Sequence, residues 1–257
     1  LYRFLKKQKK LFFIYKNLQK QDIITIFKIP DILNPIYAKI CRKIGGVQRY
    51  LYYQTYKRLC TKNFKTNGKL VVFFLQFQPE KGTCPQGIVF CDQLKLIKFI
   101  RKILDDDVAL IIKEHPSQVS PNYSRYIEKN RSFKFYKELS SLPNTFLIPL
   151  YFNIFSLKKS TIYISVTGTI IIEAALRGFP SICLGHAWYD QLPTISNAKS
   201  YKELKFILNN LDYVQEKADK KESINYFKKL TKFINNSVTL GGPLFSYPQN
   251  IDSYKEK

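Results

Sequence analysis

A lysine and a histidine stand two residues apart in the segment Lys113-Glu114-His115-Pro116, directly after the apolar run 108–112. An ammonium and an imidazole so close together are suitable hydrogen-bond donors to a phosphate. Pro116 disfavours a helical conformation at His115, so the backbone there is expected to be extended. The segment therefore predicts a phosphate-binding loop, with an ordinary loop that contains a histidine as the alternative.

A second candidate is the turn Thr167-Gly168-Thr169, which precedes a helical pattern that contains Glu173. Gly168 allows close approach of the backbone, and two hydroxyl groups beside free helix N–H groups suit an anion. Glu173, one turn into the helix, is expected to accept hydrogen bonds from ribose hydroxyls. The alternative is ordinary helix capping by a threonine, with Glu173 favoured only by the positive end of the helix dipole.

Glu80 is the candidate general base. It ends the segment Gln78-Pro79-Glu80 and precedes a loop rich in glycine and proline, KGTCPQG, of a kind that often covers a site. A solvated loop glutamate is the alternative. Asp105-Asp106-Asp107 precede an apolar run instead of following one, so we interpret them as a polar turn and expect no metal site.

Short apolar runs alternate with longer helical patterns from residue 70 onward, which indicates a parallel sheet with helices on both faces. The expected strands are 70–77, 108–112, 145–148, 162–166 and 181–184. The expected helices are 92–104, 122–139, 152–158, 169–177, 202–209 and 214–233. The fold class predicted for residues 67–257 is therefore a Rossmann-like α/β domain.

These strands should place polar residues along one edge of the sheet, because ligands of such sheets bind beyond the carboxyl ends of the strands. Both histidines of the chain follow expected strands in this way. The complete set expected at this edge is Glu80, Lys113, His115, Pro116, Pro149, Thr167, Gly168, Thr169, Glu173 and His186.

Residues 1–66 are expected to form a separate segment. The range 36–62 predicts a helix interrupted by Gly45-Gly46, which either lies on a membrane surface or packs on a neighbouring domain. Asn67-Gly68 is a turn signal at the expected boundary. The chain contains no methionine, even at position 1, so we expect a fragment that has lost its natural start. No apolar run approaches the ~20 residues that a membrane-spanning helix needs.

The charge and the cysteine content of the chain indicate which partners and which cellular compartment to expect. Lys and Arg number 42 against 19 Asp and Glu, which gives a formal charge of +23. Such a charge favours binding to anionic membranes, nucleic acid or acidic polymers. The alternative is that lysine is simply the default surface residue in a chain of this composition. The five cysteines are odd in number and form no C-x-x-C pair, which predicts reduced thiols in a cytosolic protein.

Three motifs together resemble the capsular polysaccharide biosynthesis family, which includes Kdo transferases. They are QPE(x4)P-x-G-x4-D-Q, IIKEHP and S-V-T-G-T-x3-EA-x2-RG-x-P, the last followed by LG-x-A-WYD. The resemblance spans about residues 70–195. It implies a GT-B glycosyltransferase whose Rossmann-like half holds a nucleotide-sugar, with residues 1–66 a remnant of the acceptor-side domain. The His-Pro pair and the hydroxyl-rich turn are also similar to the donor-phosphate motifs of bacterial sialyltransferases that use CMP-sugars.

The resemblance implies a CMP-activated acidic sugar such as Kdo as donor and an anionic glycan or glycolipid as acceptor. His115 and Lys113 would stabilise the departing phosphate, and Glu80 would assist the acceptor hydroxyl, with neither metal nor cofactor. The expected location is the cytoplasmic face of the inner membrane, with other capsule-assembly proteins as partners and no nucleic acid.

Three alternatives stay open. A polyol-phosphate transferase that uses CDP-glycerol has a similar His-Pro loop, but its turn usually resembles D-Y-S-S more than Thr167-Gly168-Thr169. A sugar-nucleotide epimerase of GT-B fold is the second. A non-catalytic basic module that binds RNA or lipid would explain the charge, but not the polar loops at one sheet edge. The absence of Walker, G-x-S-x-G, H-E-x-x-H and G-x-G-x-x-G motifs argues against P-loop NTPases, serine hydrolases, zincins and dinucleotide dehydrogenases.

Overall fold

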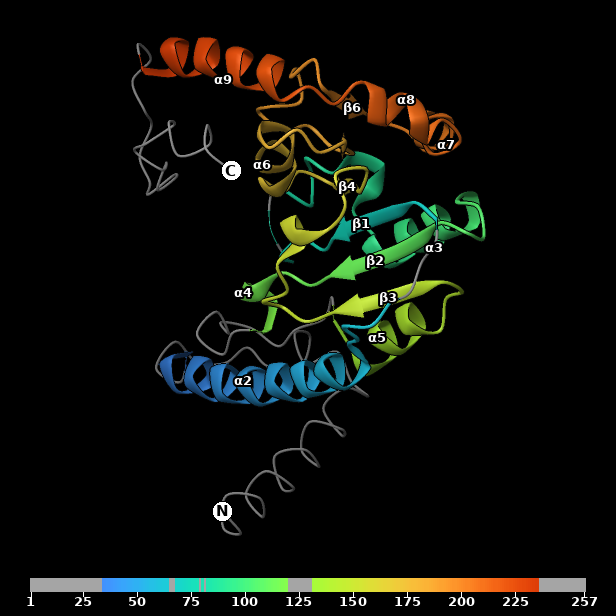
Figure 1. The fold of residues 1–257 in the computed structure, drawn as a ribbon. Helices are drawn as coiled ribbons and strands as arrows, with labels where there is room; N and C mark the ends of the chain where they lie inside the picture. Colours follow the sequence, from blue (N-terminus) through green and yellow to red (C-terminus); the bar gives the residue numbers. More distant parts are fainter. Residues whose placement is uncertain (1–33, 65–67, 79, 81, 120–130, 236–257) are drawn as a thin grey trace. The chain divides into compact units, whose positions relative to one another are not determined.

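The computed structural model describes residues 34–64, 68–78, 80, 82–119 and 131–235. The chain forms two compact units (Figure 1). Unit 1 comprises residues 1–59 and 116–137, and unit 2 comprises residues 60–115 and 138–257. The division expected from the sequence, between residues 66 and 67, stays a prediction.

Unit 1 is organised around the long helix α2 (Asn34–Leu59). This helix continues through Gly45-Gly46, so the predicted interruption there is wrong. Tyr52 and Tyr56 lie one helical turn apart, share a face of α2 and are buried. Their rings pack on Phe133, at 5.0 Å edge to face, and on Tyr136, at 5.3 Å.

The helix expected over 122–139 is described only from its second half. Residues 120–130 lie outside the described part of the chain, and α5 runs over Phe133–Ser140. The Ser132 hydroxyl oxygen accepts a hydrogen bond from the backbone N–H of Phe135 at 3.0 Å, which fixes the start of α5. The short helix α4 (Pro116–Val119) completes the described part of unit 1.

Unit 2 contains a six-stranded parallel sheet in the order β3-β2-β1-β4-β5-β6 (Figure 1). The strands are β1 (Leu70–Phe74), β2 (Ala109–Lys113), β3 (Thr145–Ile148), β4 (Ile162–Ser165), β5 (Ser181–Cys183) and β6 (Ile195–Asn197). Five were predicted, although β1 ends three residues earlier than expected. The predicted Rossmann-like α/β fold class is confirmed. The sixth strand, β6, was missed because Ile195 is the only apolar residue among its three, whereas the equally short β5 continues into the apolar Leu184.

The helices of unit 2 follow the strands. They are η3 (Ile88–Phe90), α3 (Gln93–Ile103), η5 (Ile154–Ser156), α6 (Ile170–Leu176), α7 (Tyr201–Leu208), α8 (Leu211–Glu216) and α9 (Lys220–Asn235). The single helix predicted over 214–233 is wrong, because α8 ends before α9 begins. The Asp219 carboxylate accepts hydrogen bonds from the N–H groups of Lys221 and Glu222, at 2.7 and 3.0 Å, and so starts a new helix. No described helix is long and apolar enough to span a bilayer.

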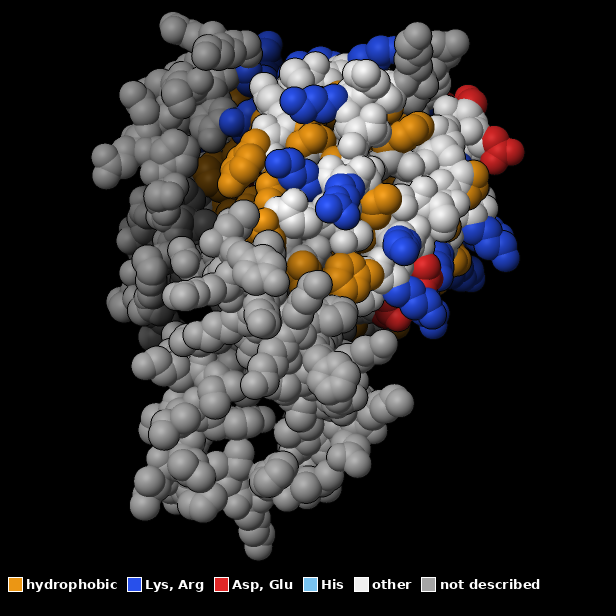
Figure 2. All heavy atoms as spheres, turned by 90° about the horizontal axis from the view of Figure 1, so that it is seen from below, with side chains coloured by type: hydrophobic (Ala, Val, Ile, Leu, Met, Phe, Trp, Pro, Cys, Tyr) orange, Lys and Arg blue, Asp and Glu red, His pale blue; other side chains and the backbone are white. Residues whose placement is uncertain are grey.

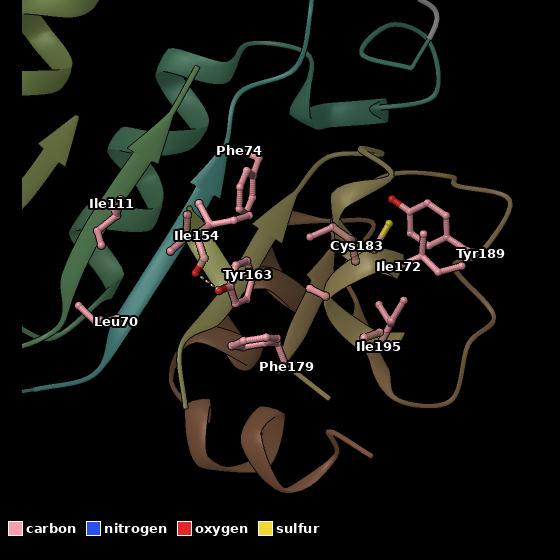
Figure 3. Packing of buried hydrophobic residues seen from close by; sticks show 14 of the residues in the cluster. Leu70, Phe74, Ile111, Ile154, Tyr163, Ile172, Phe179, Cys183, Tyr189 and Ile195 are labelled. Carbon is pink, nitrogen blue, oxygen red and sulfur yellow. Dashed lines mark hydrogen bonds between the residues drawn. The ribbon is translucent and has the colours of Figure 1, made fainter. Parts of the chain in front are cut away.

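One face of the sheet packs against α6 in a continuous apolar cluster (Figure 3). Alternate residues of β1 and β2, such as Phe74 and Ile111, point to this face because side chains of a strand alternate. Tyr163 of β4 stacks on Phe74 with 5.7 Å between ring centroids and donates its hydroxyl to the Ile154 carbonyl at 2.7 Å. This core fixes α6, and with it Glu173, against the sheet.

The last residues of the six strands lie in one register row. The row runs Ile148, Lys113, Phe74, Ser165, Cys183, Asn197. Because β1 has β2 on one side and β4 on the other, the chain reverses its direction of sheet growth there. The carboxyl ends of β1 and β4 therefore flank the crevice in which open α/β sheets bind ligands. Neighbouring strands are ~4.8 Å apart, so Lys113 and Ser165 lie ~10 Å from each other across β1.

Candidate functional site

The side chain of Gln76, which follows β1, reaches across to the turn that follows β4. Its carboxamide lies 2.8 Å from the Thr167 hydroxyl. With the amide oxygen assigned toward the turn, it accepts hydrogen bonds from the backbone N–H groups of Thr167 and Gly168, at 3.1 and 2.9 Å. The backbone of Gln76 is itself held by the carboxamide of Gln93 from α3, at 2.9 and 3.2 Å. Two N–H groups that the sequence predicts to face an anion are thus occupied by Gln76 in this structure.

The turn Thr167-Gly168-Thr169 is held from a second direction by Tyr189. The buried hydroxyl of Tyr189 donates a hydrogen bond to the Gly168 carbonyl. Burial raises the pKa of Tyr189 well above its ordinary value, so this hydroxyl stays protonated and remains a donor. Thr169 is exposed, and its side chain makes no capping hydrogen bond to α6. The capping role considered for Thr169 as the alternative is therefore not observed.

The loop after β1 packs over this turn. The Thr167 hydroxyl donates to the Gly82 carbonyl at 2.7 Å, and the backbone N–H of His186 donates to the Gln86 carbonyl at 2.9 Å. A Cβ atom on Gly185 would lie 2.6 Å from the Thr167 side chain and 2.8 Å from the Gln86 carbonyl oxygen. The loops that follow β1, β4 and β5 are therefore in direct contact.

Glu80 lies at the start of the same loop. Its carbonyl accepts hydrogen bonds from the N–H groups of Thr83 and Cys84, both at 3.0 Å, which form the first turn of the loop. As a residue Glu80 is exposed, yet its surroundings partly desolvate the carboxyl group and raise its pKa. A carboxylate with a raised pKa is a stronger base than an ordinary surface glutamate.

Lys113 and Glu173 form the charged pair of the site. Both are half-buried, and each acts electrostatically on the other without an ion pair within 4 Å. Burial lowers the pKa of Lys113, and Glu173 partly offsets this effect. Burial likewise raises the pKa of Glu173, and Arg177 and Lys113 partly offset it. Lys113 Nζ also donates to the Phe152 carbonyl at 3.4 Å, which aims the ammonium along the end of the sheet.

His115 follows β2, as predicted, and is half-buried. Its backbone N–H donates to the carboxylate of the buried Glu114 at 2.7 Å, and its ring lies 6.1 Å from that of Phe77. Pro116 comes next and begins α4 in unit 1. Pro149 follows β3, where its carbonyl accepts a hydrogen bond from Phe152 at 3.0 Å.

His186 is exposed beyond β5, with Nδ1 3.7 Å from the Asp190 carboxylate. Burial is the largest single effect on the pKa of Asp190 and would raise it, but the hydrogen bond from Lys199 at 2.7 Å and the Lys199 charge, together with smaller effects of Gln191 and His186, outweigh it, so the pKa is lowered. Lys199 also donates to the Gly185 carbonyl. This network fixes the segment after β5 on which Tyr189 is carried.

Three important residues of the site were not predicted, namely Gln76, Tyr189 and Lys199. The sequence prediction includes Gln76 in the expected strand 70–77. The only sequence signal that could have marked it as a site residue is its position just after a buried apolar run. Tyr189 belonged to the quoted WYD motif, but its link to Gly168 depends on long-range packing. Within the described ranges, no group of three or more His, Cys, Asp or Glu side chains is arranged to hold a metal ion. The predicted polar turn Asp105-Asp106-Asp107 is exposed and precedes β2, at the opposite end from the site.

Comparison with known proteins gives one family match. The model of the family described as capsule polysaccharide biosynthesis protein matches residues 16–226. No curated protein matches the chain.

Three solved structures are similar to this chain at low identity. They are the KpsC β-Kdo 2,7-transferase of Thermosulfurimonas dismutans (15% identity, TM-score 0.40, 69% of this chain and 52% of that one), a UDP-N-acetylglucosamine 2-epimerase candidate from Listeria monocytogenes (11%, 0.41, 71% and 52%) and the wall teichoic acid polymerase TagF (12%, 0.34, 72% and 46%). The chain spans about half the length of these structures.

Proposed function

The chain belongs to the capsule polysaccharide biosynthesis protein family, and from this premise we propose that unit 2 is the nucleotide-sugar-binding part of a glycosyltransferase. The proposed donor is a CMP-activated acidic sugar such as Kdo, and the proposed acceptor is an anionic glycan or glycolipid. The observation that carries the proposal is the meeting of the loops after β1, β4 and β5 at the crevice beside β1, with Lys113 and Glu173 at its charged end.

Lys113 and His115 would act on the leaving group. Cleavage of the bond between sugar and phosphate leaves negative charge on the phosphate oxygens. A half-buried ammonium stabilises such charge more strongly than one in water, because the surrounding dielectric is lower. The exposed hydroxyl of Thr169 is a further donor at this end of the sheet.

Glu173 would hold the nucleoside. A carboxylate accepts hydrogen bonds from two neighbouring ribose hydroxyls, and charged acceptors make the stronger bonds. Its raised pKa reflects desolvation, which such bonds would compensate. Glu80 would take the proton of the acceptor hydroxyl, for which its raised pKa is suitable.

The excess positive charge would hold the protein at the anionic cytoplasmic face of the membrane. On the face drawn in Figure 2, Lys and Arg side chains lie between hydrophobic ones, with few acidic side chains among them. Such a surface attracts anionic lipid headgroups and an anionic glycan alike.

A thermal-shift screen with CMP, CDP, UDP and GDP tests the proposal. A ligand that binds only the native state raises the unfolding temperature, so CMP is expected to give the largest shift, in the presence of EDTA as well. Lys113→Met should remove the shift, whereas Lys158→Met, on the exposed segment before β4, should keep it. A shift with UDP but not CMP would contradict the cytidine donor, and a larger shift with CDP would favour a polyol-phosphate transferase.

A further inference from the structure

Two cysteines lie in the loop after β1, the loop that packs over the turn of Thr167. They are Cys84 and Cys91, on either side of the short helix η3. Cys84 is exposed, Cys91 is half-buried, and both are reduced in this structure. Their side chains are in contact, because a hydrogen bond joins the two thiols.

The backbone between these cysteines is tightly bent, which brings the thiols together. The N–H of Ile88 donates to the Pro85 carbonyl at 2.9 Å and closes a turn directly after Cys84. The Cys91 thiol in turn donates to the Ile88 carbonyl at 2.9 Å, so its sulfur points back toward this turn. Ile88 has a φ of 52°, which a β-branched residue seldom adopts. The packing of the loop therefore holds a strained backbone between the two thiols.

The two thiols differ in how readily they react. The exposed Cys84 is accessible to a small oxidant in solution. Burial raises the pKa of Cys91, and the neighbouring Cys84 thiol raises it further, so Cys91 stays protonated. Because the thiolate is the form that peroxides oxidise, Cys84 is the sulfur expected to react first. Cys91 is then placed to react second.

We propose that Cys84 and Cys91 are a reversible oxidation site, at which hydrogen peroxide converts the two thiols into a disulfide. Peroxide transfers one oxygen atom to Cys84 Sγ, its O–O bond breaks, and a sulfenic acid and water result. Cys91 Sγ then attacks Cys84 Sγ, so that the S–S bond forms as the S–O bond breaks. The departing hydroxide takes the Cys91 proton and leaves as a second water. A dithiol reductant reverses the reaction.

The disulfide would change the loop beside the crevice. It withdraws the Cys91 thiol from the Ile88 carbonyl. Gln86 lies within the ring that the disulfide closes, and its carbonyl accepts the hydrogen bond from the His186 N–H at 2.9 Å. The His186 amide is therefore a reporter of oxidation on a different loop. The site goes beyond the proposed glycosyl transfer, in which neither cysteine has a role.

Peroxide treatment of the full chain, followed by mass mapping, tests the assignment. Both cysteines lie between Lys81 and Lys95, so one tryptic peptide contains them. We expect this peptide to lose two hydrogen atoms and to regain them with dithiothreitol. Cys91→Ser should instead leave Cys84 as a sulfenic acid that dimedone labels. Cys60→Ser, which removes a half-buried cysteine elsewhere, is the matched control and should leave the disulfide unchanged.

Amide NMR shows whether the disulfide acts on the crevice. The His186 resonance should move when the native protein is oxidised and should not move in Cys84→Ser. The Thr161 N–H, which donates to the Lys158 carbonyl at 2.9 Å before β4, should stay unchanged in both proteins.

Three results would overturn the proposal. One is a peptide that keeps both thiols while glutathione added to the same solution is oxidised. Another is a disulfide that joins two chains instead of Cys84 and Cys91 of one chain. The third is a His186 resonance that does not move in the oxidised protein. Failure of the CMP screen would leave this proposal intact, because oxidation of the loop requires no nucleotide.

Discussion

The carboxamide of Gln76 and the hydroxyl of Thr167 lie 2.8 Å apart, although 91 residues separate them in the sequence. One follows β1 and the other follows β4, so this contact joins the two strands that flank the crevice. Because the same carboxamide also accepts from two backbone N–H groups, it sets the conformation of the turn that begins α6.

Gln76→Leu should destabilise the protein by about 2 kcal/mol, because the N–H groups of Thr167 and Gly168, both half-buried residues, lose their acceptor. Urea unfolding measures the change. Gln76→Glu keeps an acceptor oxygen, so the free energy of unfolding should fall by less than in Gln76→Leu. Gln215→Leu, which removes one surface hydrogen bond to the Ser160 carbonyl, is the control and should change stability by no more than about 0.5 kcal/mol.

Substitution of two glycines by alanine should have opposite effects. Gly185→Ala forces a methyl group against Thr167 and the Gln86 carbonyl, and should cost about 1–3 kcal/mol. Gly46→Ala in α2 meets open space and should stabilise by about 0.5–1 kcal/mol, because glycine is a poor helix former. Equal effects in thermal unfolding would show that the loops around Thr167 are not closely packed.

The pKa of Glu173 predicts a pH dependence of stability. Burial raises this pKa above the ordinary value of 4.5, so the neutral carboxyl is the form favoured by folding. Protonated Glu173 therefore contributes to the free energy of unfolding. This contribution is complete below pH 4.5 and is lost as the pH rises through the raised pKa of Glu173 in the folded protein. Glu173→Gln should therefore gain stability relative to the native protein across that window. Glu216→Gln, on an exposed position of α8, should show no such trend in urea unfolding at the same pH values.

The same variant separates nucleoside binding from helix stabilisation. If Glu173 accepts hydrogen bonds from ribose, Glu173→Gln should bind CMP more weakly and pyrophosphate equally or more tightly, since a nearby negative charge disappears. Calorimetric titration of both ligands against both proteins measures this. Equal CMP affinities would exclude Glu173 from the site.

His115→Ala should weaken CMP binding by roughly 1.5–3 kcal/mol, the range for a hydrogen bond to a charged group. The free energy of unfolding without ligand should change little, because the imidazole is half-buried at the end of a strand. A variant that unfolds readily but binds CMP normally in its folded fraction would show that His115 is structural.

The net charge of +23 predicts binding to anionic vesicles that is lost as salt rises. Exposed charges are screened over ~8 Å at physiological ionic strength, so high salt alone should release the protein in a sedimentation assay. Binding that resists salt but yields to detergent would indicate insertion of aromatic side chains. Neutral vesicles are the control.

The alternation of strands and helices was predictable because buried strands are short, apolar and separated by helical patterns. The places of Lys113, His115, Thr167 and His186 at the carboxyl ends of strands were predictable for the same reason, and their roles in a site stay predictions. What the sequence could not reveal was pairing over long distances, such as Tyr189 with Gly168 and Gln76 with Thr167. It also missed the break between α8 and α9, because Asp219 caps a helix inside a pattern that reads as continuous.

The central position of β1 has a consequence for how the protein is made. Its pairing with β2 closes a short stretch of chain, whereas its pairing with β4 waits for Ile162–Ser165 to be synthesised. Until then one edge of an entirely apolar strand has unpaired backbone groups, which is a template for aggregation. The nascent chain therefore exposes this strand edge until β4 is made, and β5 and β6 can join the sheet only afterwards.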